Sequence, residues 1–505
     1  MPGGGYRRAM SDTSLTRRRL LQAGAAGALA GALEGPGGAV ARTRRSKRAD
    51  VVVVGAGFSG LTAARALKAA GHSVMVLEAR DRVGGRTQNA RIAGGKAIAE
   101  VGGEFVGPTQ DRILALAKAT GVPTFKVYNE GSSVFLARGQ RTLYSAAVGV
   151  PDDAETTAAL GAMVELDAIG KAVGVAAPWK HAKAREYDRQ TLAEFLAPKV
   201  TTPAGAAILG AVCQAVWGAD PQEVSLLFAA TYVAAAGNAS TPGSVIRLIA
   251  TPGGAQERRL AGGSVLVAQK VAAQLGSRVV LGAPVRRIVQ RDGGITVSAD
   301  GITVDAQRAI VAVPPVLATR IQYAPGLPAA KRALLRAMTP GSLSKVQAVY
   351  PTPFWREAGL SGQGIADSGL ARVPWDNSPP DGSVGVFFSF IGGARHAEWA
   401  RLPAAERRAR VLDDFVRFTA DERARTPDEF LEKDWTTERW TRGCPTGHFA
   451  PGVLAAHGAQ LRAPVGRIHF AGTETADYWL GYMDGAVRAG ERAAAEAGRA
   501  LRTRS

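Results

Sequence analysis

Three glycines near the start of the chain have the spacing that lets a backbone turn hold a pyrophosphate. Gly55, Gly57 and Gly60 stand in DVVVVGAGFSG, between a run of four valines and a helical segment. Gly55 permits the tight turn, Gly57 lets the backbone approach the phosphates, and Gly60 lets helix and strand pack closely. The N–H groups of the helix N-terminus then face the anion. GxGxxG alone is a weak signal, but strand, turn and helix together indicate dinucleotide binding.

An acidic residue and a second glycine loop follow this turn. Glu78 ends the next apolar run, SVMVLEA, where a carboxylate can accept the hydroxyls of a ribose. This residue favours a 2′-hydroxyl over a 2′-phosphate, but it does not separate NAD from FAD. Arg80, Gly85 and Arg86 come directly afterwards in EARDRVGGRT. They place a second phosphate-contacting loop where an extended FAD would lie, so the pattern favours FAD.

From this loop onward the chain resembles the flavin monoamine oxidase family, over nearly all of the expected mature chain. Five separated segments carry the resemblance in the family's order. Such a set is specific for the family and much less specific for a substrate. The segments are EVGGEFVGPTQDRILALAKATGV, GGAQERRLAGG, APVRRI, GSLSKVQAVYPTPFW and GRIHFAGTETADYWLGYMDGAVRAGERAA.

The resemblance implies a set of residues that contact FAD. Val285 matches an adenine contact, and Met483 stands where a backbone N–H meets the pyrimidine edge of the flavin. Trp435 matches an aromatic residue beside the isoalloxazine ring. The residues that match pyrophosphate and ribityl contacts are Gly472, Thr473 and Glu474.

The resemblance also implies two catalytic candidates. Lys345 matches a lysine that holds a water at flavin N5, and Tyr482 matches one wall of an aromatic cage that frames the amine. Gln256 lies in the segment that matches the family's crossing of the substrate cavity. Residue types alone favour plainer roles, because single lysines are usually solvated and large apolar side chains usually form core. Further positions that align with the cavity or its entrance are Trp217, Leu248, Ile249 and Trp375.

Cys444, in TRGCPTGHF, matches the cysteine that forms a thioether to the flavin in the mitochondrial enzymes. Most free cysteines are instead buried small apolar side chains. Covalent and non-covalent FAD both stay open. The chain departs from the family at the next residue, because Pro445 stands where those enzymes have the second cage tyrosine. This departure leaves the cage half built and the substrate class open.

The implied reaction is oxidation of a small primary or secondary amine. Burial in an apolar pocket favours the neutral amine over the ammonium. Tyr482 would hold the amine near the flavin, which takes a hydride or its equivalent because the hard chemistry belongs to the cofactor. Lys345 and its water would then assist reduction of O2 to hydrogen peroxide. The imine product hydrolyses to an aldehyde or ketone and ammonia or a shorter amine.

Alternatives of the same fold stay open. A flavin amine dehydrogenase or desaturase would pass electrons to another acceptor or act on a non-amine. An L-amino-acid oxidase would need a buried arginine in the cavity to bind the substrate carboxylate. A third class is a non-catalytic FAD-binding protein. Peroxide production and anaerobic bleaching of the flavin by an amine separate these hypotheses.

The order of apolar and helical segments predicts an α/β fold, of the mixed α+β kind. Segments that share the cofactor lie at both ends of the chain, so we expect a Rossmann-like FAD-binding domain that is discontinuous. A substrate-binding domain of helices and antiparallel sheet is inserted into it. The FAD-binding domain is expected in 42–130, 245–330 and 430–505, and the inserted domain in 131–244 and 331–429.

The first 41 residues read as an export signal. Arg17, Arg18 and Arg19 precede a mild apolar run, and Ala39–Ala41 supply the small residues of a cleavage site. Twin arginines followed by leucines resemble a Tat signal. This predicts export of the folded protein by the Tat machinery, to a periplasmic, cell-wall or secreted location. Tat export suits a protein that acquires its cofactor before it leaves the cytoplasm.

Composition narrows the partners. The net charge is +19, but the basic residues are spread along the chain, without the blocks of a nucleic-acid arm. The two cysteines and six histidines lack metal-ligand spacing, so we expect no metal. Outside the signal no apolar stretch is long enough for a stable membrane anchor. The oligomeric state stays open, a homodimer included.

Overall fold

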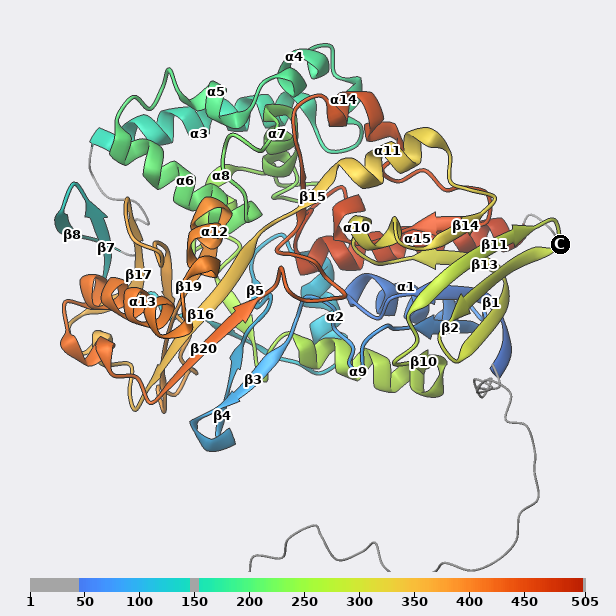
Figure 1. Ribbon diagram of the computed structural model, residues 1–505, viewed down its shortest axis with the longest axis horizontal. Coiled ribbons are helices and arrows are strands. Elements are labelled where there is room, and N and C mark those ends of the chain that lie inside the picture. The colour runs from blue at the N-terminus through green and yellow to red at the C-terminus, as the bar shows by residue number, and fades with distance from the viewer. Residues whose placement is uncertain (1–44, 146–153, 503–505) are drawn as a thin grey trace, which may run out of the picture. The chain divides into compact units, whose positions relative to one another are not determined.

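The computed structural model describes residues 45–145 and 154–502. The expected signal, residues 1–41, lies outside the described residues. The described parts belong to one compact unit. Two helices that pack on its largest sheet come from opposite ends of the chain, and the strands of that sheet come from the beginning, the middle and the end of the chain (Figure 1).

The largest sheet grows from the valine run. Val51, Val52 and Val53 are fully buried, as in a parallel strand that is covered on both faces. The strand that contains these valines pairs in parallel with one neighbouring strand on each side. On one side the sheet then continues with antiparallel strands. The parallel strands are β1 (Arg45–Val54), β2 (Val74–Leu77), β10 (Val279–Val280), the end of β13 (Ile302–Val311) and β22 (Ile468–Phe470). The remaining strands are β11 (Val285–Arg291), β12 (Gly294–Ala299) and β14 (Gln322–Ala324).

Two helices from opposite ends of the sequence lie side by side beneath this sheet: α1 (Phe58–Ala69) and α15 (Met483–Arg502) (Figure 1). A glycine makes the contact possible, because a Cβ on Gly490 would lie 2.3 Å from the carbonyl oxygen of Ser59. Buried apolar side chains of both helices share one cluster with β1 and β2. Two further helices complete this layer, α2 (Asp111–Ala119) and α9 (Val265–Leu275).

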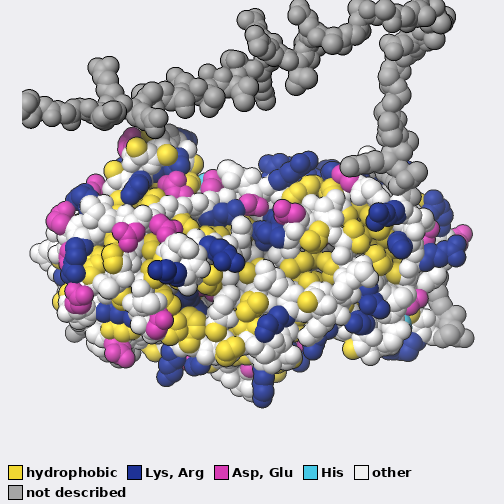
Figure 2. Space-filling view, turned by 90° about the horizontal axis from the view of Figure 1, so that it is seen from below, with side chains coloured by type: hydrophobic (Ala, Val, Ile, Leu, Met, Phe, Trp, Pro, Cys, Tyr) yellow, Lys and Arg dark blue, Asp and Glu magenta, His cyan; other side chains and the backbone are white. Residues whose placement is uncertain are grey.

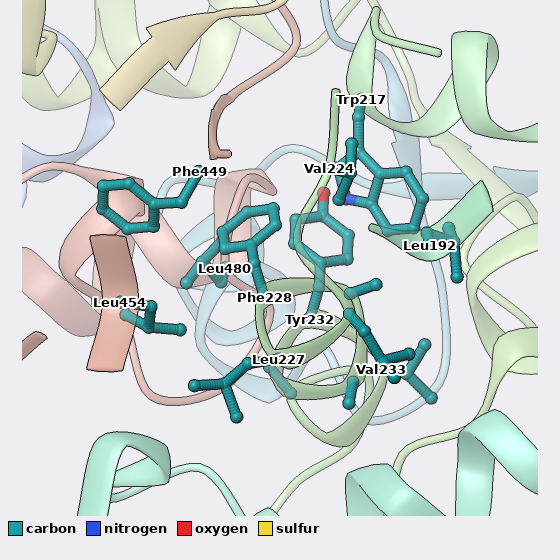
Figure 3. Packing of buried hydrophobic residues seen from close by; sticks show 14 of the residues in the cluster. Leu192, Trp217, Val224, Leu227, Phe228, Tyr232, Val233, Phe449, Leu454 and Leu480 are labelled. Carbon is teal, nitrogen blue, oxygen red and sulfur yellow. The ribbon is translucent and has the colours of Figure 1, made fainter. Parts of the chain in front are cut away.

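An Ala-rich group of helices forms a second core around α7 (Leu226–Ala234), which is buried along nearly its whole length. Figure 3 shows its Tyr232 and Phe228 beside Trp217 and Phe449. The group thus closes over apolar side chains from α6 and from the C-terminal part of the chain. Its helices are α3 (Ala154–Val173), α4 (Ala184–Arg189), α5 (Leu192–Leu196), α6 (Pro203–Trp217), α8 (Val245–Ile249), α11 (Ala329–Ala337) and α14 (Val453–His457).

A second sheet centres on β16 (Leu343–Tyr350), in which every residue is buried. It is antiparallel, in the order β18 (Pro374–Asp376), β19 (Gly385–Gly392), β16 and β20 (Glu429–Asp434). Phe387 and Phe415 meet edge to face, at 4.9 Å between ring centroids, where α13 covers the sheet. The helices at this end are α12 (Gly393–Arg401) and α13 (Ala404–Thr419).

Small sheets connect these layers. The sheet β5–β9–β6 places the Gln256 segment beside the loop that follows the first glycine motifs. The strands are β3 (Asn89–Ile92), β4 (Ala97–Glu100), β5 (Phe105–Val106), β6 (Thr124–Lys126), β7 (Ser132–Ala137), β8 (Gln140–Ser145), β9 (Arg258–Leu260), β15 (Met338–Pro340), β17 (Leu360–Ala366) and β21 (Gly447–Phe449). The remaining short helix is α10 (Pro315–Ala318).

The mixed α/β fold predicted from the sequence is confirmed. The helical segment predicted after the glycine turn is α1, and Gly57 is its N-cap. The residue bounds of the two predicted domains stay a prediction.

The described residues contain no helix that is long and apolar enough to cross a membrane. Nor do they contain a group of three or more His, Cys, Asp or Glu side chains that could hold a metal ion. On the face shown in Figure 2, Lys and Arg side chains are scattered among acidic and hydrophobic ones.

Candidate active site

One cavity of about 650 Å³ lies between the two sheets and the helical group. It contains the side chains or backbone of nearly every residue that the sequence proposed for the site. Among the predicted residues, Gly60, Glu474 and Trp217 do not line it. The predicted residues that line it are Gly55, Gly57, Glu78, Arg80, Gly85, Arg86, Leu248, Ile249, Gln256, Val285, Lys345, Trp375, Trp435, Cys444, Gly472, Thr473, Tyr482 and Met483.

The first glycine turn has the geometry of an anion cradle. Gly55 has φ +102°, and a Cβ there would lie 2.8 Å from the carbonyl oxygen of Ala312. A Cβ on Gly60 would lie 2.0 Å from the oxygen of Gly55, so only glycine lets α1 start this close to β1. A Cβ on Gly57 would meet only Gly85, at 3.9 Å. Two glycine backbones therefore face each other across the space beside an uncapped helix N-terminus.

Glu78 is fixed at the carboxyl end of β2. Its Oε2 accepts a hydrogen bond from the N–H of Ala56 at 2.7 Å, and its Oε1 accepts one from the N–H of Arg80 at 2.9 Å. The residue is 4% exposed. This carboxylate thus lies at the edge of the cavity next to the glycine turn, where the sequence placed the ribose.

The C-terminal FAGTET segment meets the N-terminal motifs directly. Its Gly472 N–H donates to Ser59 Oγ in the glycine turn at 2.9 Å. Arg86 holds Glu474 with two hydrogen bonds of 2.6 and 3.1 Å, and its Nη1 also donates to the Pro445 carbonyl. Burial alone would lower the pKa of Arg86, and the Glu474 carboxylate raises it above its usual value. The guanidinium therefore stays charged where two distant segments join.

These features fit a dinucleotide that extends through the cavity. Glycine backbones, a free helix N-terminus and a ribose-side carboxylate occupy one end. Trp435, which donates from Nε1 to the Val101 carbonyl at 2.8 Å, and Cys444 border the part beyond Arg86. The length and chemistry of this arrangement match FAD better than a mononucleotide.

Lys345 lies in the cavity wall on β16, where it faces a partner that the sequence analysis missed. Its Nζ lies 2.6 Å from Oε1 of Glu104, and both side chains are 1% exposed. Burial lowers the pKa of Lys345, and burial raises the pKa of Glu104, while each charge opposes the shift of the other. A lone glutamate in a loop carries no sequence signal for this role, because 241 positions separate the two residues.

Tyr482 projects from the start of α15 into the cavity. Burial raises the pKa of its phenol, so the hydroxyl stays neutral. Trp479 packs against one side at 4.9 Å between centroids, and Tyr232 lies 6.2 Å away on another. Tyr232, on α7, also lines the cavity, and the sequence analysis missed it. Among the described residues, Trp479 and Tyr232 are therefore the aromatic neighbours of Tyr482. Pro445 also lines the cavity but contributes no ring π-system there.

The far lobe of the cavity is mostly apolar, and its polar lining residues are Gln256, Gln363, Ser133, Tyr144, Thr156 and Thr251. Gln256 donates from Nε2 to the Leu248 carbonyl at 2.9 Å, and its Oε1 has no hydrogen bond to a described residue. Trp375 stacks on Phe388 at 5.6 Å and borders this lobe. Trp217 lies in the helical core against Tyr232 instead of in the lining. The apolar lining includes Phe135, Leu160, Ile208, Val212, Ile246 and Ile365.

Fold and site together define a protein that holds FAD across two glycine motifs and encloses an apolar chamber beside it. A family profile described as "Flavin containing amine oxidoreductase" matches residues 58–497. The chain belongs to this family. It is an FAD-dependent oxidoreductase that oxidises amines, as the sequence resemblance predicted.

Individual relatives support this assignment over most of their length. The flavin-containing monoamine oxidase AofH of Mycobacterium tuberculosis is 41% identical over 454 residues, which cover 88% of this chain and 96% of that protein. Flavin-containing amine oxidase B of Sus scrofa is 37% identical over 455 residues, which cover 89% of this chain and 86% of that protein.

Two solved structures have closely similar folds. Putrescine oxidase bound to putrescine has a TM-score of 0.85 at 36% identity, over 90% of this chain and 99% of that one. Cyclohexylamine oxidase from Brevibacterium oxydans has the same TM-score at 33% identity and the same coverage.

Proposed function

We propose that this enzyme oxidises small primary or secondary amines to imines and passes the electrons to O2, which becomes hydrogen peroxide. The observation that carries the proposal is the enclosure of Lys345 and Tyr482 in one cavity with both glycine motifs. When bound there, FAD supplies the two-electron oxidation. The residues of the chain bind the amine, keep it neutral and exclude water.

Three side chains have separate roles in this proposal. The ring of Tyr482 holds the amine against the flavin, in the orientation that its contact with Trp479 fixes. The free Oε1 of Gln256 accepts an N–H of the substrate. Lys345 would place a bound water, or its own ammonium, in the part of the cavity where O2 would meet the cofactor. The apolar walls favour the neutral amine over the ammonium.

The cavity favours an amine over an amino acid. The described lining contains two arginines, and both already contact carboxylates: Arg86 contacts Glu474, and Arg80 contacts Glu78 and Glu438. Neither lies in the far lobe. Recognition of a substrate carboxylate would need such an arginine as a bidentate partner. The L-amino-acid oxidase alternative is therefore less well supported than the amine oxidase.

Among amines, we propose that those with an apolar substituent are preferred. Cyclohexylamine oxidase is therefore a closer guide to the substrate than putrescine oxidase. Burial of apolar area contributes about 25 cal/mol per Å², so a ring that loses about 100 Å² of exposed surface gains about 2.5 kcal/mol. The described lining of the far lobe contains amides and hydroxyls, Gln256 and Gln363 among them, but no Asp or Glu side chain that could pair with a second ammonium.

The test is a panel of amines with a peroxide readout under air and a flavin-absorbance readout without oxygen. Amine-dependent peroxide supports the oxidase. Bleaching without peroxide on readmission of air would show a dehydrogenase instead. No bleaching by any amine, in protein that holds FAD, would show a non-catalytic flavoprotein.

We extend the proposal to a thioether between Cys444 and a methyl carbon of the flavin. The S–H bond and one methyl C–H bond would break, and the two electrons released would pass to the flavin itself and then to O2. The thiol lines the cavity, and among the described residues its only contact of hydrogen-bonding type is with the Leu343 carbonyl at 3.8 Å. Burial raises the pKa of Cys444, and Arg86 opposes that shift. Acid-precipitated protein should stay yellow, whereas Cys444→Ala should release its FAD to the supernatant. Release from both proteins would contradict the link.

The export signal also becomes a proposal for the cell. Twin arginines ahead of a short apolar run support Tat-dependent export of the folded, FAD-loaded protein. Replacing Arg17, Arg18 and Arg19 by lysine should retain active enzyme in the cytoplasmic fraction. Continued export of that variant would contradict the assignment.

A further inference from the structure

The cavity contains a buried ion pair between Glu104 and Lys345. The proposed function gives Lys345 a role but gives Glu104 none. The loop after β4 provides the acid, and the middle of β16 provides the base. Both side chains line the cavity and are 1% exposed. The Lys345 ammonium also lies 4.2 Å from the centroid of the Phe388 ring. Among the described residues, Lys345 forms an ion pair only with the Glu104 carboxylate.

The backbone that positions Glu104 is fixed to the cofactor loops. Gly103 N–H donates to the Arg86 carbonyl at 3.1 Å, and Val101 N–H donates to the Gln88 carbonyl at 2.9 Å. The Val101 carbonyl in turn accepts from Trp435 Nε1 at 2.8 Å. The carboxylate is thus held by the same segments that border the FAD cavity, and it has little freedom to turn away from Lys345.

The neighbouring charges are already committed elsewhere. Arg259 on β9 contacts Glu100 Oε2 through Nε and Nη2, at 3.0 and 2.5 Å, and donates to the Asn377 and Ser378 carbonyls. Glu100 raises the pKa of Lys345 and Arg259 lowers it, so these two neighbours act on Lys345 in opposite directions. Neither Lys345 Nζ nor either Glu104 oxygen has a hydrogen bond to any other described group. Their remaining hydrogen-bonding capacity is left for the cavity.

We propose that Glu104 is a positioning residue that keeps Lys345 protonated and aimed into the flavin cavity. This inference rests on the proposed function and names a residue that acts only through Lys345. A buried ammonium without a countercharge loses its proton, because desolvation penalises the charged form. Glu104 therefore sets the pH range in which the site presents a positive charge beside the cofactor.

The test follows the visible spectrum of bound FAD against pH, without turnover. The Lys345-dependent transition is the part of the pH change that Lys345→Met abolishes. In Glu104→Gln its midpoint should move down by at least about one pH unit, a tenfold change in proton affinity. Glu104→Asp, which keeps the charge, should restore the midpoint toward that of the unaltered enzyme.

Two controls separate positioning from general damage to the fold. Glu432→Gln on the neighbouring strand β20 removes a carboxylate from an ion pair with Arg407 outside the cavity, and it should leave the midpoint unchanged. The double variant E104Q/K345M should give the same spectrum as K345M at every pH, because the acid acts only through the lysine. It also removes both charges together, which spares the fold an unpaired buried charge.

Three outcomes would overturn the inference. The first is an unchanged midpoint in Glu104→Gln, and the second is a double variant whose spectrum differs from that of K345M. The third is the absence of a Lys345-dependent transition between about pH 6 and 10 in both the unaltered enzyme and Glu104→Gln. Failure of the proposed function would look different. In that case no amine would bleach the flavin, while the spectral transition and its shift would still be measurable.

Discussion

Breaking the ion pair between Arg86 and Glu474 should weaken the protein far more than breaking an exposed pair of similar geometry. Glu474→Gln keeps the size of the side chain and removes the charge. The Glu474 side chain is 2% exposed and that of Arg86 is 23% exposed, so the variant leaves a largely buried guanidinium with neutral partners only, the introduced amide oxygen and the Pro445 carbonyl. Removal of one member of a buried pair typically costs about 3–5 kcal/mol. Because Arg86 keeps some contact with water, we expect about 3 kcal/mol.

The matched control is Asp300→Asn. Arg286 and Asp300 also form a two-bond pair, at 3.0 and 2.7 Å, but their side chains are 47% and 50% exposed. Exposed pairs contribute about 1 kcal/mol or less. Both variants should be compared with the unaltered protein by denaturant unfolding, with FAD release followed in the same samples.

Glu474→Gln should unfold at lower denaturant concentration and release FAD earlier than Asp300→Asn. Equal loss of stability in the two variants, or retention of FAD by Glu474→Gln up to the midpoint of the unaltered protein, would refute the reasoning. That result would mean that the Arg86–Glu474 contact does not join the two cofactor segments.

Three further predictions concern stability and binding. Burial lowers the pKa of His448 to about 4, from 6.5 when exposed. The unfolded chain therefore binds more protons between these values, and the free energy of unfolding should fall by about 3 kcal/mol as the pH drops from 6.5 to 4. His448→Leu should reduce this loss of stability in urea unfolding, and an unchanged loss would contradict the assigned cause. Gly60→Val should abolish FAD binding, since even a Cβ would lie 2.0 Å from the Gly55 oxygen; a yellow variant with normal stability would argue against the close helix–strand contact. Cyclohexylamine should have a kcat/KM at least about tenfold above that of putrescine, a difference of about 1.4 kcal/mol, and the reverse order would show that the lobe does not select apolar substituents.

Local sequence patterns predicted the glycine turn and its flanking strands and helix well, because the residues that define these elements lie close together in the sequence. The valine run, the GxGxxG turn and the acid at Glu78 lie within about thirty residues, which is the span of one βαβ unit. Their backbone requirements, such as the positive φ of Gly55, are visible in the sequence as glycines.

Contacts between distant segments could not be predicted in the same way. Glu104 has no neighbour in sequence that identifies it as the partner of Lys345, and the pair exists only because the loop after β4 crosses the middle of β16. Tyr232 lies in an apolar helix, where the sequence pattern predicts that a tyrosine belongs to the hydrophobic core, and its side chain is buried.

The central claim is that the N-terminal glycine turn and the C-terminal FAGTET segment enclose one FAD beside an amine chamber. Anaerobic titration of the purified mature protein with cyclohexylamine tests it most directly. The account predicts yellow protein whose visible flavin band bleaches completely and returns on admission of air. Colourless protein that takes up no added FAD, or bound FAD that no amine in the panel reduces, would contradict the claim.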